Sequence, residues 1–177
     1  MITVFAMILL SFLILRVNNM FLQTNNTLYT SKFEVLGYTL AQSMIQEIER
    51  LDFDQNTVSA AISDSNSLSA TLGKETGETT YDTFNDIDDY DDYTRTDTIP
   101  AHSGTVFNIR CTVEYVLPTT PDVATASKTW QKKITVYVAS PYMTSNAHYS
   151  VSKTATNLYS QLDTIKLSQV YSYWIFK

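Results

Sequence analysis

The sequence predicts an α+β protein, in which one long N-terminal helix packs against a C-terminal antiparallel β-sheet head. Residues 1–53 contain no proline, and their only glycine is Gly37, so little in this stretch forces a helix to stop. Beyond residue 104, three segments alternate apolar and polar side chains with the period of two that is typical of half-buried strands. We therefore expect a helix over residues 1–53 and a β-rich head over residues 54–177.

Residues 1–24 form the apolar part of the predicted helix. The stretch MITVFAMILLSFLILR has no basic residue before Arg16, and no pair of small residues follows that would suit signal cleavage, so it does not resemble a secretory signal. Residues 1–15 span about 22 Å as a helix, less than a bilayer core of ~30 Å, but apolar residues up to Leu22 extend the segment. We expect this segment to be retained and covered by lipid or by copies of itself.

Residues 25–53 read as the amphipathic part of the same helix. Apolar residues recur every three or four positions, with polar and charged residues between them, which predicts one apolar stripe. The stripe is expected to pack on the head and consists of Phe33, Leu36, Leu40, Met44, Ile48 and Leu51. The alternative is two shorter helices, with a break around residues 23–27.

Three strands are predicted in the head, over residues 105–117, 130–140 and 163–176. Their inward faces are expected to carry Phe107, Ile109, Cys111, Val113, Tyr115 and Leu117, then Trp130, Ile134, Val136 and Val138, then Ile165, Leu167, Tyr171 and Tyr173. Residues 118–127 contain two prolines and are expected to form a loop, and residues 143–161 a long loop or a short hairpin. Cys111 is the only cysteine, so no disulfide forms within the chain, and its place on an apolar face predicts a buried, inert thiol.

Charge is divided unevenly along the chain. Residues 51–100 hold two basic and twelve acidic side chains, whereas residues 101–177 hold seven basic and three acidic ones, and the net charge is −6. An acidic chain without a Lys/Arg cluster is a poor nucleic-acid binder, so no nucleic-acid partner is expected. The opposite charges of the two regions are expected to attract each other within one head or between neighbouring copies.

An acidic loop is predicted over residues 82–97. Five aspartates within seven residues could supply oxygen ligands to Ca²⁺, namely Asp86, Asp88, Asp89, Asp91 and Asp92. An EF-hand loop starting at Asp86 would need Gly and Glu where Asp91 and Asp97 stand, so that motif is absent. The pattern favours a solvated loop, or one paired with Lys132 and Lys133, over a Ca²⁺ site, and no other cofactor is expected.

Enzyme motifs are absent from the sequence. His102 and His148 have no accompanying series of catalytic partners, and there is no GxSxG, no glycine-rich phosphate loop and no His/Cys cluster with metal-ligand spacing. We therefore expect a protein that is not an enzyme.

The order of segments resembles that of the type IV pilin and pseudopilin superfamily. The apolar segment and amphipathic helix are followed by TYDTFNDIDDYDDY, VFNIRCTVEYV and KKITVYVAS, as in many pilin-like subunits. The resemblance implies a structural subunit of an extracellular filament at the cell surface. It also implies a stay in the inner membrane before assembly, a pilus assembly machinery and copies of the chain as partners, and a short leader removed by a prepilin peptidase.

In such a filament the apolar segments pack together in the centre. The side chains expected to make these contacts are Phe5, Ile8, Leu9, Phe12, Leu13, Leu15, Met20 and Phe21, with Arg16 finding an acceptor such as a backbone carbonyl or Asn18 or Asn19 of a neighbour. In a membrane anchor, Arg16 would instead lie at the interface. The chain differs from the usual pilin pattern in having no acidic residue in 1–15, no proline in the helix and no cysteine pair.

Two alternatives to a major filament subunit remain at this stage. The first is a minor pilin or pseudopilin that serves a secretion or uptake machine, and abundance would separate it from a major subunit. The second is a membrane-anchored periplasmic domain whose acidic loop binds Ca²⁺.

Overall fold

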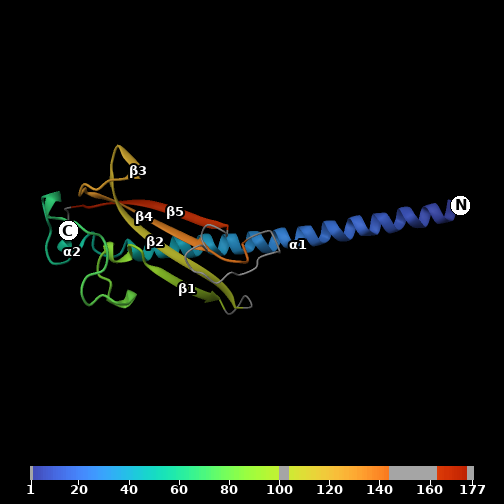
Figure 1. The fold of residues 1–177 in the computed structure, drawn as a ribbon, viewed down its shortest axis with the longest axis horizontal. Helices are drawn as coiled ribbons and strands as arrows, with labels where there is room; N and C mark the ends of the chain where they lie inside the picture. The colour runs from blue at the N-terminus through green and yellow to red at the C-terminus, as the bar shows by residue number, and fades with distance from the viewer. Residues whose placement is uncertain (1, 100–103, 144–162, 175–177) are drawn as a thin grey trace.

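The computed structural model describes residues 2–99, 104–143 and 163–174 and has the predicted α+β fold. Helix α1 (Ile2–Ile48) is followed by the short helix α2 (Gln55–Val58) and by the 3₁₀ turns η1 (Ser65–Ser67), η2 (Tyr81–Thr83) and η3 (Asp88–Tyr90). The strands are β1 (Thr94–Ile99), β2 (Thr105–Leu117), β3 (Thr120–Ala124), β4 (Gln131–Ala139) and β5 (Thr164–Ser172). The second half of α1 lies along the sheet, and its first half projects away from the head (Figure 1).

Helix α1 is continuous through residues 23–27, where the alternative placed a break. The hydroxyls of Thr24 and Thr27 donate to the carbonyls of Met20 and Gln23 within the helix. The helix ends at Ile48, five residues before the expected boundary at 53. The chain tightens there, because the Leu51 amide donates to the Ile48 carbonyl over 3.1 Å and the following residue, Asp52, forms a bridge with Asp86.

The amphipathic part of α1 covers β4 and β5. Of the predicted stripe, Met44 and Ile48 are buried, and the other four residues are half-buried against the same core: Phe33, Leu36, Leu40 and Leu51. The closest approach to the sheet is at Gly37, where an added Cβ would lie 2.9 Å from Ile165 Cδ1. The absence of a side chain at Gly37 therefore lets the helix rest directly on β5.

The sheet is antiparallel, with the order β1-β2-β4-β5, and β3 pairs with the end of β2. The predicted inward residues of β2 are buried except Leu117, which is exposed, while Val116 is fully buried in its place. The register of β2 against β3 shifts between Val116 and Leu117, and this irregularity reverses the alternation. The expectation for Leu117 was therefore wrong.

Two strands lie where the sequence predicted loops. β1 occupies the end of the expected acidic loop, and β3 lies within residues 118–127 despite its proline, because it is an exposed edge strand. Cys111 is fully buried, as predicted, and burial raises the pKa of its thiol to about 12. The long loop or hairpin expected over residues 143–161 falls, except for Met143, outside the described residues.

Candidate functional site

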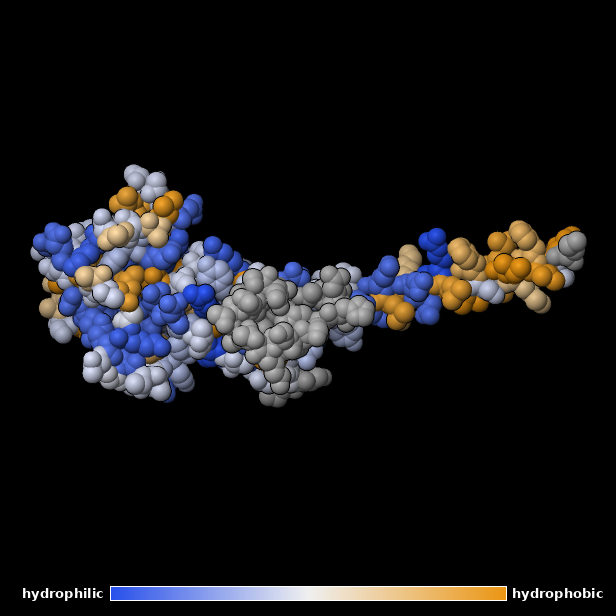
Figure 2. Space-filling view, viewed as in Figure 1, coloured by the Kyte–Doolittle hydropathy of each residue, from blue (hydrophilic) through white to orange (hydrophobic). Residues whose placement is uncertain are grey.

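The projecting part of α1, here called the stalk (residues 2–24), is covered with apolar side chains that have no partner among the described residues of the chain. Fifteen large apolar residues between Ile2 and Leu22 have exposed fractions of 53–86%. The apolar surface gathers at the end of the stalk that lies far from the head (Figure 2). All predicted filament contacts lie on this exposed stalk, namely Phe5, Ile8, Leu9, Phe12, Leu13, Leu15, Arg16, Met20 and Phe21.

Arg16 is the charged residue of the stalk. Its guanidinium lies 5.5 Å from the centroid of the Phe12 ring, one helical turn earlier, so the charge rests over an aromatic face. The polar Ser11 of the same region donates its hydroxyl to the carbonyl of Met7 over 2.9 Å. The stalk therefore presents few free hydrogen-bonding groups apart from Arg16 and the neighbouring asparagines.

The stalk is long and apolar enough to cross a membrane. Helix α1 is the one helix of the described residues that meets this criterion, and none of its most apolar window is buried. Residues 2–22 rise about 31 Å as a helix, which matches a bilayer core of ~30 Å. Lipid and other copies of the chain are thus both able to cover it.

A second polar feature lies inside the head, where Lys132 is fully buried. Its ammonium donates to Asp54 Oδ2 over 2.9 Å, to Asp88 Oδ1 over 2.5 Å and to the carbonyl of Phe53 over 2.7 Å. The rings of Phe53 and Tyr115 flank it, with centroids 4.5 and 5.1 Å away. This cluster joins the segment after α1, the turn η3 and strand β4 at one point.

The two carboxylates that share Lys132 differ in their other partners. Asp54 also accepts from the Asn56 and Ser69 amides and from the Tyr115 hydroxyl. Burial acts to raise the pKa of Asp54, but Lys132 and these amides hold it below its ordinary value. Among the described residues the side chain of Asp88 is paired with Lys132 alone, and burial raises the pKa of Asp88 to about 8. One ammonium thus neutralises one of two buried carboxylates.

The five aspartates of the acidic run point to different partners. Asp88 binds Lys132, Asp91 accepts from the Val113 amide, and Asp92 accepts from Arg110. Asp86 uses Oδ1 to accept from the amides of Asp88 and Asp89. The run therefore does not converge on one ion. Of the two lysines expected to pair with it, Lys132 does so, whereas Lys133 pairs with Glu114.

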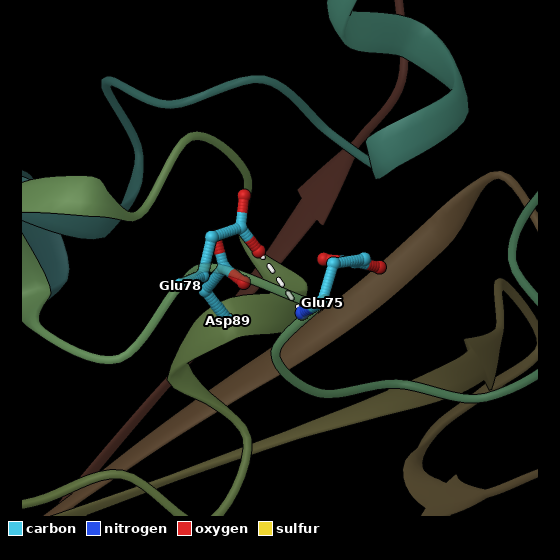
Figure 3. Close-up of side chains that lie close together, drawn as sticks. All are labelled: Glu75, Glu78 and Asp89. Atoms are coloured by element: carbon cyan, nitrogen blue, oxygen red, sulfur yellow. Dashed lines mark hydrogen bonds between the residues drawn. The ribbon is translucent and has the colours of Figure 1, made fainter.

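The structure instead gathers a different set of carboxylates. Ligand atoms of Glu75, Glu78 and Asp89 all lie within 4.8 Å of one another, and Figure 3 shows these side chains close together. Asp89 is fully buried, and the other two are half-buried. Burial, followed by the neighbouring acids, raises the pKa of Glu75 to about 7, and burial is also the main reason that the pKa of Asp89 rises to about 6.

Sequence reasoning named Lys132 as a partner of the acidic loop but missed its burial and its pairing with Asp54, and it missed Glu75 and Glu78. The burial of Lys132 could have been predicted, because Lys132 has the same parity in its strand as Trp130 and Ile134 and therefore faces inward. The glutamates carried no local signal, since their partner Asp89 is more than ten residues away along an irregular segment.

Comparisons with known proteins assign no family. No protein-family model, no curated protein and no solved structure matches this chain. Its fold, a long apolar N-terminal helix joined to an antiparallel sheet, is compatible with that of pilin-like subunits.

Proposed function

We propose that this chain is the structural subunit of an extracellular type IV pilus-like filament and that it polymerises through the stalk. The observation that carries the proposal is the stalk itself, which is apolar around its circumference and exposed along its length. Fully burying one such side chain stabilises by about 1.5–3 kcal/mol, so fifteen of them left in water would be strongly unfavourable. The stalk needs a cover that the described part of the head does not supply.

The rigid connection between stalk and head favours a filament over a simple anchor. Helix α1 runs without interruption from the stalk into the head, where Gly37, Ala41 and Ile45 lie against the sheet or the core. The head is therefore held at a fixed distance and orientation from the stalk. A repeated, non-closing contact between copies needs such a fixed geometry, whereas an anchor tolerates a flexible linker.

Coverage of the stalk by copies of itself explains how subunits leave the membrane. The same apolar side chains contact lipid before assembly and neighbouring stalks afterwards, so the transfer loses little hydrophobic stabilisation. Arg16 is then expected to bind a carbonyl or an asparagine of a neighbour, because an unpaired buried charge is unfavourable. Inner membrane, assembly machinery and other subunits are the partners of this proposal.

The experiment that tests the proposal is electron microscopy of material sheared from cells expressing the intact chain. We expect thin filaments labelled along their length by an antibody against the head. Leu13→Lys, which places a charge in the stalk, should abolish them. Val123→Lys, a matched change at an exposed apolar residue of β3, should leave them intact. Label confined to filament tips would contradict a major subunit and indicate a minor pilin.

A membrane-anchored domain is the second candidate, and the observation that favours it is that α1 can span a bilayer. It predicts that all of the protein stays in the membrane fraction after shearing. It also predicts that Leu13→Lys weakens retention in the membrane, and that neither the parent nor this variant forms filaments. Cell fractionation of the same two variants separates the candidates.

A further inference from the structure

We propose that Glu75, Glu78 and Asp89 form a Ca²⁺ site in the head, independent of the proposed filament function. The three carboxylates come from two segments, the stretch after Leu72 and the turn η3. Their ligand atoms lie within 4.8 Å of one another. Oxygens bound to one Ca²⁺ at 2.3–2.6 Å can be separated by up to about 5 Å, so the spread fits a single ion.

The site holds buried oxygen atoms that the described residues leave without hydrogen bonds. Asp89 is fully buried, and while its Oδ2 accepts from the amides of Asn85 and Asp86, its Oδ1 has no partner among the described residues. Glu75 Oε2 is likewise buried without a partner there. A buried carboxylate oxygen that lies near other carboxylates and accepts no hydrogen bond from the described residues points to a cation as its missing partner.

Among the described residues, no positive side chain pairs with these carboxylates. The ion pairs between described residues involve none of the three carboxylates. The ammonium of the adjacent Lys74 lies over the rings of Phe84 and Tyr93, at 5.1 and 5.5 Å from their centroids. Lys132 is already held by Asp54 and Asp88. The Lys132 cluster thus has its cation built in, and the Glu75 cluster does not.

Two further buried oxygens, in the segment that precedes η3, have no hydrogen-bond partner among the described residues. Asn85 donates through Nδ2 to Glu78 Oε1 over 2.5 Å, while its own Oδ1 is buried and unpartnered among the described residues. A half-turn of this amide would offer that oxygen to the same ion. Asp86 Oδ2 is also buried without such a partner. A set of carboxylate and amide oxygens of irregular geometry is typical of Ca²⁺ rather than of Mg²⁺, which demands a regular octahedron.

A bound ion would tie the 73–80 stretch to the centre of the head. Glu75 and Glu78 already form a tight turn, in which the Glu75 amide donates to Glu78 Oε2 over 3.0 Å (Figure 3). Gly73 and Gly77, both with positive φ, flank Glu75 on its two sides. On the other side, Asp89 belongs to η3, whose Tyr90 hydroxyl donates to Glu47 of α1 over 3.3 Å. The ion would therefore link an outer stretch to the base of the helix.

The test is isothermal titration of the intact chain in detergent micelles with CaCl₂, after removal of metal with EDTA, at pH 7.5. We expect one ion per chain, with a Kd between about 10⁻⁴ and 10⁻³ M as for extracellular modules, and a rise in the thermal midpoint at saturation. Glu78→Gln and Asp89→Asn should each weaken binding at least tenfold. Asp82→Asn, at an exposed carboxylate on η2, is the matched control and should bind as the parent does.

Thermal unfolding in EDTA separates loss of the site from loss of the fold. In EDTA, Glu78→Gln should have a thermal midpoint at or above that of the parent, because the substitution removes repulsion between carboxylates. In Ca²⁺, its thermal midpoint should lie below that of the parent. Absence of binding by the parent chain would overturn the proposal. An equal loss of Ca²⁺ affinity in Asp82→Asn would also overturn the proposal. So would binding of Mg²⁺ by the parent chain as tightly as Ca²⁺. Filament formation does not enter these measurements, so they stand or fall separately from the proposed function.

Discussion

The first and last parts of α1 both carry large apolar side chains, but among the described residues only the last part packs against the rest of the chain. Met44 and Ile48 are buried against the sheet, whereas Leu9 and Phe12 are more than half exposed. The same helix therefore contributes to the folded core at one end and, under the proposed function, to assembly at the other. Substitutions at the two ends should change different measured quantities.

The largest effect is expected inside the head, from Lys132→Met. This variant leaves the ionised Asp54 buried without its cation and removes the donor to Asp88, which should lower the free energy of unfolding by about 3–5 kcal/mol. Both tryptophans lie outside the stalk, so fluorescence during urea unfolding in micelles reports on the head. Lys133→Met, which removes a more exposed pair with Glu114, should cost at most about 1 kcal/mol. Equal losses in the two variants would contradict the assigned role of Lys132.

Two alanine substitutions, one at each end of α1, compare the buried part of the helix with the stalk. Ile48→Ala should lower the free energy of unfolding by about 2–5 kcal/mol, because it leaves a cavity in a fully buried site. Leu9→Ala should change the same quantity by less than about 0.5 kcal/mol, yet reduce the yield of sheared filaments. If Leu9→Ala destabilised the head as much as Ile48→Ala, the division of α1 into two roles would be wrong.

The buried carboxylates predict an unusual pH dependence of head stability in EDTA. Burial raises the pKa of Asp86 to about 7 and that of Asp88 to about 8, so the folded state holds protons that the unfolded state releases near pH 4. The free energy of unfolding should then fall as the pH rises from about 5 to 7, by about 1.4 kcal/mol per pH unit for each such group. Asp86→Asn should flatten this slope in urea titrations at several pH values. A slope of the opposite sign would show that these groups are ionised in the fold.

The smallest effect is expected at the contact between helix and sheet. Gly37→Ala places a Cβ 2.9 Å from the end of the flexible Ile165 side chain, which can turn away. The gain in helix propensity, about 1 kcal/mol, should offset this contact and leave the free energy of unfolding within about 1 kcal/mol of the parent. Gly37→Leu should destabilise clearly more, because Met143 and Val138 lie on the same side. If Gly37→Leu left the free energy of unfolding unchanged, α1 would not lie in close contact with β5.

Much of the fold was predictable because its signals are local and periodic. The spacing of Leu36, Leu40, Met44 and Ile48 indicated the buried face of α1, and alternation indicated β2, β4 and β5. The irregularity at Val116 and Leu117 depends on the pairing with β3, so alternation alone could not reveal it. Edge strand β3 has no apolar face to mark it.

Of the two candidate sites, one could be predicted from the sequence and the other could not. The apolar segment itself was predictable, since its composition alone sets it apart, whereas its contacts in a filament stay a prediction. The acidic cluster was not predictable, because it depends on which carboxylates the fold brings together. Asp88 accepts a hydrogen bond from Lys132, and Asp91 accepts one from the Val113 amide. Glu75 and Glu78 lie close to Asp89 only because of the tertiary fold.

The central claim is that copies of the stalk cover one another, and photo-crosslinking from within the stalk tests it most directly. Benzoylphenylalanine would replace Phe12 in the intact chain, with replacement of Val123 as the control for the head. After irradiation of sheared extracellular material, the account predicts a ladder of covalent oligomers from position 12. Protein that remains in the membrane fraction and yields only lipid adducts and monomers from position 12 would contradict it.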